Sequence, residues 1–107
     1  MTMLPNKFFV VILKYIVSIE EIDHHRPAHL EYLQKYYDEG VFLASGRQVP
    51  KFGGIILAKT TDRKKLYEIL SEDPFHKHLC AEYQVNEFAV NNYTDSFKNF
   101  LQESGLI

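Results

Sequence analysis

A run of six apolar residues, Phe8-Phe9-Val10-Val11-Ile12-Leu13, constrains the fold of this chain more than any other feature. It is β-branched and aromatic, a composition that favours a strand. Side chains of a strand alternate between two faces, so an unbroken apolar run is typical of a central strand covered on both sides. The run is too short to cross a bilayer, and it lacks a small-residue cleavage site. We therefore expect a central strand over about residues 7–17.

A helical region is predicted to follow this strand. Ser18 and Glu21 have the spacing of a capping box, which places a helix start near Ile19. Pro27 then either begins a second helical segment at its first position or kinks the first one. Three apolar residues at helical spacing follow the proline: Leu30, Leu33 and Tyr37. Gly40 can end the helix, because glycine readily adopts the left-handed conformation of a C′ residue.

The second half of the chain shows a similar alternation of strand and helix patterns. Asp62 can cap a helix, and Asp73 followed by Pro74 marks the start of another helical turn. The remaining elements expected are strands over about 41–45 and 53–58 joined by a wide or bulged loop at 46–52, a helix over 62–71, a helical turn over 74–79 and a strand over 82–90. This order predicts an α+β fold of the ferredoxin-like βαββαβ type, with both helices on one face of an antiparallel sheet.

The opposite face of that sheet also has to be covered. Apolar residues occur on both faces of the first and third strands, so we expect a homodimer in which two sheets stack. Near the C-terminus, four residues are spaced for one face of an extra helix: Tyr93, Phe97, Phe100 and Leu101. Thr94 can cap this helix and Gly105 can stop it. We expect residues 1–90 to form the ferredoxin-like domain and residues 91–107 to form an amphipathic helix packed on it or on a partner subunit.

Charge and cysteine content narrow the partners and the compartment. The chain has 12 basic and 14 acidic residues and a formal charge of −2, so no basic surface is expected for nucleic acid or an anionic membrane. The single cysteine, Cys80, excludes an internal disulfide and favours a reducing, cytoplasmic location. Its apolar neighbours favour packing over a nucleophilic role. No phosphate loop and no flavin or nicotinamide fingerprint occurs in the sequence, so no cofactor is expected.

Two side chains are candidates for acid–base chemistry. His29 lies in the first turn of a helix if Pro27 is its first residue, and Asp73 follows 44 residues later at another helix start. In a small mixed domain the two can meet, and a carboxylate then decides the tautomer of the imidazole and its strength as a base. The helix start would disfavour the imidazolium, whereas the carboxylate would favour it. The alternative is structural, with Asp73 capping its turn and His29 half-buried in the core.

Further residues are candidates for binding a substrate near this pair. Ser45 and Gly46 are expected to end the second strand, where a hydroxyl and an exposed N–H could bind a carbonyl or hydroxyl oxygen. Arg26 could bind an anionic group of a substrate or pair with an acidic residue on the surface. Phe75, directly after the helix start at Asp73, is a candidate for an apolar wall.

The histidines also suggest a zinc site. His25 and His29 are four residues apart, as on one helix face, and His76 and His78 follow the candidate aspartate. A helical metalloprotease motif would have a glutamate after the first histidine, where this chain has an arginine. Residues two apart on a helix also point in different directions, so His76 and His78 do not form a pair. We therefore expect no metal site.

Four blocks of sequence, in order and with compatible spacing, resemble the YciI-like family of YCII-related proteins. They are Arg26-Pro27-Ala28-His29 with the residues up to 33, Gly40-Val41-Phe42-Leu43-Ala44-Ser45-Gly46, Gly53-Gly54-Ile55-Ile56-Leu57, and Glu72-Asp73-Pro74-Phe75, and residues 81–88 of the final strand add to the match. The resemblance runs from about residue 9 to residue 90. It implies a dimeric α+β barrel and a site formed by a histidine and an aspartate, which map onto His29 and Asp73. One branch of the family includes a dehydrochlorinase that acts on a chlorinated hydroxyquinol, and most members have no assigned reaction.

Two functions of different classes fit these observations. The first is a cofactor-independent small-molecule enzyme of the lyase or isomerase type. In it, His29 moves a proton of a small cyclic or aromatic-derived substrate and Asp73 orients the imidazole. The second is a non-catalytic dimer that binds a small molecule or docks to a partner protein. A haem or quinone monooxygenase with the same barrel outline is a weaker third hypothesis, because no axial-ligand signature is present.

Overall fold

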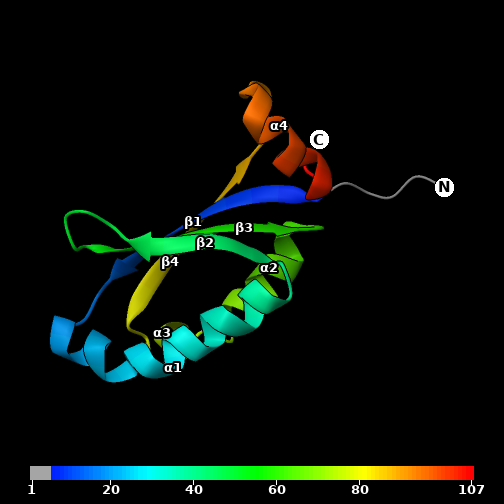
Figure 1. Cartoon of the computed structure of the whole chain (residues 1–107). Coiled ribbons are helices and arrows are strands. Elements are labelled where there is room, and N and C mark those ends of the chain that lie inside the picture. The colour runs from blue at the N-terminus through cyan, green and yellow to red at the C-terminus, as the bar shows by residue number, and fades with distance from the viewer. Residues whose placement is uncertain (1–5) are drawn as a thin grey trace.

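Residues 6–107, which the computed structural model describes, form one antiparallel sheet with helices on both sides (Figure 1). In chain order the elements are β1 (Lys7–Tyr15), α1 (Ile19–Asp38), β2 (Phe42–Arg47), β3 (Gly53–Thr60), α2 (Arg63–Leu70), α3 (Pro74–Lys77), β4 (Ala81–Phe88) and α4 (Asp95–Glu103). The strands lie in the order β2-β3-β1-β4, so β1 pairs with both β3 and β4. The predicted central position of the first strand is confirmed, although the strand ends at Tyr15. The element order and the antiparallel sheet agree with a ferredoxin-like arrangement.

The core lies between the sheet and the layer formed by α1, α2 and α3. Alternate residues of β1 point into it and are at most 2% exposed: Phe9, Val11 and Leu13. Helix α2, capped by Asp62, contributes three buried residues: Leu66, Ile69 and Leu70. Burial of this apolar surface is the main force that holds the helices against one face of the sheet.

Helix α1 runs without interruption through Pro27, which does not begin a second helical segment. Its predicted start is confirmed, since the Ser18 side chain accepts a hydrogen bond from the Glu21 N–H. Proline removes one backbone hydrogen bond, but packing of the helix against the sheet holds the turn together. The buried face is Ile22, His29, Tyr32, Leu33 and Tyr36. It is therefore rotated from the predicted stripe, and Leu30 is 54% exposed. No helix within residues 6–107 is long and apolar enough to cross a membrane.

The β2–β3 hairpin differs from its prediction in length. Strand β2 continues to Arg47, so Ser45 and Gly46 lie inside the strand and do not end it. A bulge interrupts its pairing with β3 between Phe42 and Ala44. The hydroxyl of Ser45 contacts the hydroxyl of Tyr37 on α1, so the side chain of Ser45 points toward the helix layer. Because side chains alternate along a strand, Arg47 lies on the same face.

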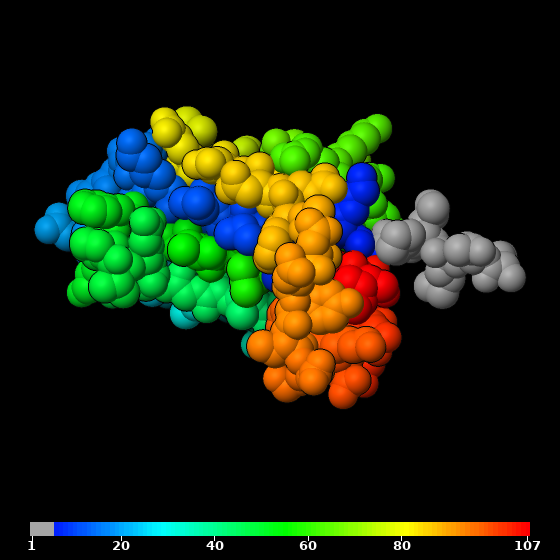
Figure 2. Space-filling model, turned by 90° about the horizontal axis from the view of Figure 1, so that it is seen from above, coloured from blue at the N-terminus to red at the C-terminus, as the bar shows by residue number. Residues whose placement is uncertain are grey.

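The sheet face opposite α1, α2 and α3 is covered in part by α4 (Figure 1). Thr94 caps this helix, and its residue Leu101 is fully buried. Asn6 holds the end of the chain, since its backbone N–H bonds the Gly105 carbonyl at 2.7 Å and its side-chain amide bonds the Ser104 carbonyl at 2.9 Å. Figure 2 shows the C-terminal segment (orange to red) over one end of this face. Four apolar residues of β1 and β3 on this face stay partly exposed: Val10, Ile12, Ile55 and Leu57.

Candidate active site

His29 and Asp73 lie in direct contact, as the sequence analysis predicted. His29 is in the middle of α1, and Asp73 is the residue that caps α3. The Nδ1 atom of His29 is 2.7 Å from Oδ1 of Asp73. The two side chains are 10% and 0% exposed. The contact is therefore largely shielded from water, which strengthens the electrostatic interaction within it.

Three donors from three parts of the fold hold the Asp73 carboxylate. Besides the imidazole, Oδ1 accepts a hydrogen bond from the backbone N–H of Phe75 at 2.9 Å. The other oxygen, Oδ2, accepts one from the hydroxyl of Tyr83 on β4 at 2.5 Å. These bonds offset the cost of taking the carboxylate out of water. They also fix its position and its orientation.

Phe75 holds the imidazole as well as the carboxylate. Its ring stacks on that of His29, with 3.9 Å between the ring centroids and 10° between the planes. With Nδ1–H donating to Asp73, the neutral imidazole carries its free lone pair on Nε2. No fully buried side-chain nitrogen or oxygen within residues 6–107 lacks a partner. The Nε2 atom of His29 has no partner in that part of the chain, so it is not fully buried and is open to the space beside it.

The place of His29 in its helix corrects the expected electrostatics. Helix α1 begins at Ile19, so His29 does not lie in a first turn. The partial positive charge of a helix start falls off within that turn and does not act on this imidazole. Asp73, in contrast, is at the predicted N-cap, with Pro74 as the first helical residue. The carboxylate and the Phe75 ring therefore orient the imidazole, without help from a helix dipole.

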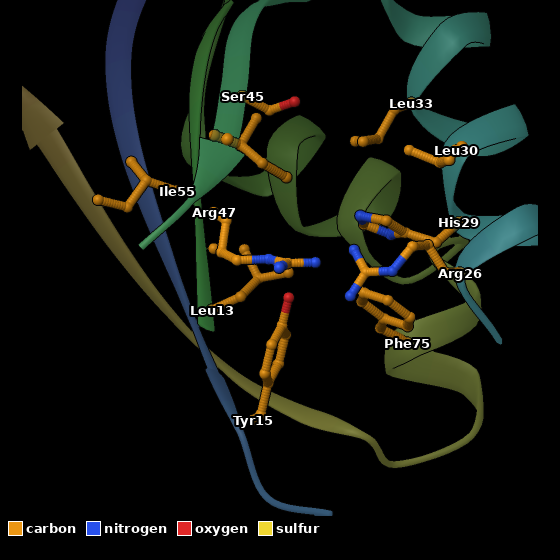
Figure 3. A pocket seen from close by; sticks show the side chains of 13 residues that line it. Leu13, Tyr15, Arg26, His29, Leu30, Leu33, Ser45, Arg47, Ile55 and Phe75 are labelled. Atoms are coloured by element: carbon orange, nitrogen blue, oxygen red, sulfur yellow. The ribbon is translucent and has the colours of Figure 1, made fainter. Parts of the chain in front are cut away.

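A cavity of about 260 Å³ opens beside the imidazole, between α1 and the sheet (Figure 3). Its apolar wall includes Leu13, Leu30, Leu33, Ile56 and Phe75. Its polar lining is formed by Tyr15, Arg26, His29, Ser45 and Arg47. All the predicted site residues except Asp73 line this cavity, and Asp73 lies behind His29 with no exposed surface. Side chains that are far apart in the sequence thus converge at one recess.

The three predicted binding residues contribute in different ways. Arg26 fits both of its interpretations, because it lines the cavity and its Nη2 atom is 3.2 Å from Oδ1 of Asp23. Ser45 lines the cavity through β2. The expectation of an exposed N–H at Gly46 was wrong. Gly46 is paired with Ile55 in the β2–β3 ladder. The backbone N–H of Gln48 donates to the Gly53 carbonyl, and every second residue pair of an antiparallel ladder exchanges such hydrogen bonds. That alternation directs the Gly46 N–H to β3, so Gly46 provides space and not a donor.

Three polar residues of the site were missed in the sequence analysis. Tyr83 was seen only as a residue of the last strand, and its contact with Asp73 depends on where α3 lies. The loop expected over 46–52 includes Arg47, whereas β2 continues to this residue and places its side chain on the face of Ser45. Tyr15 lies near the end of the predicted first strand, and nothing in the sequence marked it as a site residue. Its hydroxyl points toward Arg47 in the cavity (Figure 3).

Two phenols near the pair stay protonated at neutral pH. Burial raises the pKa of Tyr83 far above its usual value of 10, and the adjacent Asp73 charge raises it further. Burial and then the Asp73 charge also raise the pKa of Tyr32, whose hydroxyl donates to the Ile69 carbonyl at 2.8 Å. Burial likewise raises the pKa of the Cys80 thiol, which makes it a poor nucleophile. Tyr83 therefore keeps its proton and donates it in a hydrogen bond to the Asp73 carboxylate.

The other histidines considered for a zinc site make contacts away from the cavity. Within residues 6–107, no three His, Cys, Asp or Glu side chains are grouped closely enough to hold a metal ion. The Nε2 atom of His25 is 3.2 Å from Oε2 of Glu21, and the ring of His25 stacks on that of His78 at 4.1 Å between centroids. His76 packs edge-on against Tyr83.

Replacing Tyr83 by phenylalanine should destabilise the fold. The substitution leaves Oδ2 of the buried Asp73 without its donor, so we expect a loss of about 2–3 kcal/mol in the free energy of unfolding. Tyr67→Phe is the matched control, because Tyr67 is 52% exposed and should change stability by less than about 0.5 kcal/mol. Urea denaturation at neutral pH measures both variants. Equal stability of the two would contradict a supporting role for the Tyr83 hydroxyl.

Stability should also decline above about pH 10. There the unfolded chain releases the protons of Tyr32 and Tyr83 near their usual pKa of 10, whereas the folded chain keeps them. The unfolded state then binds fewer protons, and the free energy of unfolding falls by about 1.4 kcal/mol per pH unit for each residue. The stabilisation is fully present below that pH. Urea titrations between about pH 8 and pH 11 should show a shallower decline for Tyr83→Phe, and identical slopes would count against this account.

One solved structure with a similar fold is that of a dehydrochlorinase. It is 5-chloro-2-hydroxyhydroquinone dehydrochlorinase from Burkholderia phenoliruptrix AC1100, in complex with 2,5-dihydroxybenzoquinone. The TM-score is 0.70 and the alignment covers 82% of this chain and 99% of that chain. The sequence identity is 16%, so the likeness shows a shared fold alone.

The family comparison covers most of the chain. No curated protein matches this sequence. The model of the YCII-related domain matches residues 8–89, nearly the range over which the four sequence blocks showed the resemblance. The chain therefore belongs to the family of YCII-related domain proteins.

Proposed function

We propose that this protein is a small-molecule enzyme of the lyase or isomerase type, which needs no cofactor and uses His29 as its general base. The observation that carries the proposal is the buried contact between His29 and Asp73 at the wall of a cavity. A histidine held by a carboxylate, with its second nitrogen open to a recess, is the arrangement that proton abstraction requires. A merely structural histidine has no need of an unpaired nitrogen at a cavity.

The proposed reaction begins with transfer of a proton from substrate carbon or oxygen to Nε2 of His29. The imidazolium that forms is stabilised by Asp73, which holds Nδ1–H throughout. In an isomerisation the proton returns to another atom of the substrate. In an elimination the electron pair of the broken C–H bond forms a double bond, and the leaving group departs with its own electron pair. Tyr83 and the Phe75 N–H continue to donate to the Asp73 carboxylate and hold it in place.

Other residues of the cavity have roles that follow from their chemistry. The hydroxyl of Ser45 lies in the lining and supports a developing oxyanion, without the Gly46 N–H. Phe75 and Leu33 form apolar surface for a flat ring. The volume of about 260 Å³ is below the range of about 300–1,000 Å³ typical of pockets for drug-sized ligands, which favours a single-ring substrate. The structure of the dehydrochlorinase with the similar fold contains such a single-ring compound, 2,5-dihydroxybenzoquinone.

Loss of either member of the pair should strongly slow proton abstraction. A screen of small hydroxylated rings and lactones in D₂O, followed by NMR, detects proton abstraction without knowledge of the final product. For any compound that exchanges a carbon-bound proton, we expect His29→Ala and Asp73→Asn to slow exchange by at least about 100-fold. His25→Ala is the matched control, because His25 lies on the same helix and is absent from the cavity lining. Undiminished exchange in His29→Ala or Asp73→Asn would remove the pair from the mechanism.

The alternative is a non-catalytic module that binds a small molecule or docks to another protein. The cavity by itself fits this function as well as an enzyme. A thermal-shift screen over phenols and lactones identifies ligands, and their fate decides between the two functions. Ligands that bind, stay unchanged and bind equally well to His29→Ala would favour the alternative.

We further propose that the protein is a homodimer formed by the open part of the sheet, with residues 91–107 as an appendage to the core domain. Val10, Ile12, Ile55 and Leu57 form a half-buried apolar surface that α4 does not cover, and a second copy would bury it. Apolar sheet surface of this kind is costly to leave in water.

The dimer can be tested by placing one charge on the proposed interface. Leu57→Glu should convert the protein to a monomer, because a carboxylate cannot be buried there without a partner. Val49→Glu is the control, since Val49 lies in the β2–β3 loop and is 91% exposed. Sedimentation velocity measures both. A monomeric unmodified protein, or a Leu57→Glu protein that stays dimeric, would overturn the proposed interface.

A further inference from the structure

The charged side chains that line the cavity are both arginines. Arg26 comes from α1 and Arg47 from the end of β2, on opposite walls of the recess. Figure 3 shows the two guanidinium groups directed into the space between these walls. No Asp or Glu lines the cavity within the described part of the chain. The recess therefore carries a concentrated positive charge in a protein whose formal charge is −2.

The two arginines differ in how much of their charge is already paired. Asp23 lies 3.2 Å from both Nε and Nη2 of Arg26, so this guanidinium is held in place and partly compensated. Arg47 has no ion-pair partner among residues 6–107. Its neighbour across the ladder is Gly54, whose missing side chain leaves room on that side of the cavity. An arginine left free to bind in a recess is a common means of recognising planar oxyanions.

We propose that this cavity binds a small planar oxyanion, either a carboxylate or a ring phenolate or enolate, and that Arg47 is its main anchor with Arg26 opposite. The apolar walls take the body of the ligand, and the size of the cavity limits it to about one ring. In the proposed reaction, which this inference extends, the guanidiniums would also stabilise negative charge that develops when His29 removes a proton. The anion site itself depends only on the arrangement of the cavity.

Binding of matched probes tests the site without turnover. Benzoate and benzamide have nearly the same shape but differ in charge. 4-Nitrophenolate, at a pH where the phenol is ionised, differs from neutral 4-nitroanisole by its charge and one methyl group. Titrations followed by the amide NMR spectrum at low salt give a dissociation constant for each probe. We expect at least one anion to bind at least about tenfold more tightly than its neutral partner, and the two pairs distinguish a carboxylate from a phenolate ligand.

Variants at the two arginines locate the anion. Arg47→Gln should weaken binding of the preferred anion by about tenfold or more, the loss expected for a charged hydrogen bond, and Arg26→Gln should weaken it less. Arg47→Lys keeps the charge and should recover part of the affinity. Lys64→Gln is the control, because it removes one positive charge from an exposed position on α2.

The outcomes separate this inference from the proposed enzyme activity. The anion site is wrong if neither anion binds at millimolar concentration, if the neutral probes bind as tightly, or if Arg47→Gln behaves like Lys64→Gln. Arg47→Lys as weak as Arg47→Gln would also contradict it, since charge would not be the determinant. None of these results affects the proton exchange assigned to His29. Conversely, anion binding that persists in His29→Ala would support the site even if the exchange assay failed.

Discussion

The buried carboxylate of Asp73 is the interaction on which the arrangement of this protein depends. It receives hydrogen bonds from His29 on α1, from the backbone of Phe75 on α3 and from Tyr83 on β4. A charge with no exposed surface is tolerated only when such partners surround it. All three hydrogen bonds form only if two helices and one strand meet at the Asp73 carboxylate. The carboxylate therefore couples the packing of the helix layer to the geometry of the site.

The same group connects the fold to the proposed chemistry. By accepting Nδ1–H of His29, it leaves Nε2 as the open nitrogen, and the ring of Phe75 prevents the imidazole from turning away. The cavity in front of this nitrogen is lined by apolar side chains and by two arginines. A base beside a positive recess suits a substrate that is an anion or becomes one as it loses a proton. The proposed general base and the proposed anion site are thus compatible, but they rest on different residues.

Local signals in the sequence predicted much of the secondary structure correctly. Ser18, Asp62, Asp73 and Thr94 each cap a helix at the expected position, because capping depends on a short side chain and a few neighbouring amides. The errors arose where distant contacts overrule local preference. Helix α1 continues through Pro27 because it packs along the sheet, and β2 extends beyond Gly46 because β3 offers a partner as far as Gly54.

The sequence by itself determined the order of the elements, the central place of the first strand and the identity of the His29–Asp73 pair, since apolar periodicity, capping residues and family motifs are local patterns. Only the tertiary structure decided which other side chains join that pair. Tyr83 and Arg47 reach the site because α3 docks beside β4 and because β2 keeps its register with β3 beyond the predicted end. Such contacts depend on register and helix docking, which arise from the packing of the whole core and leave no local pattern in the chain.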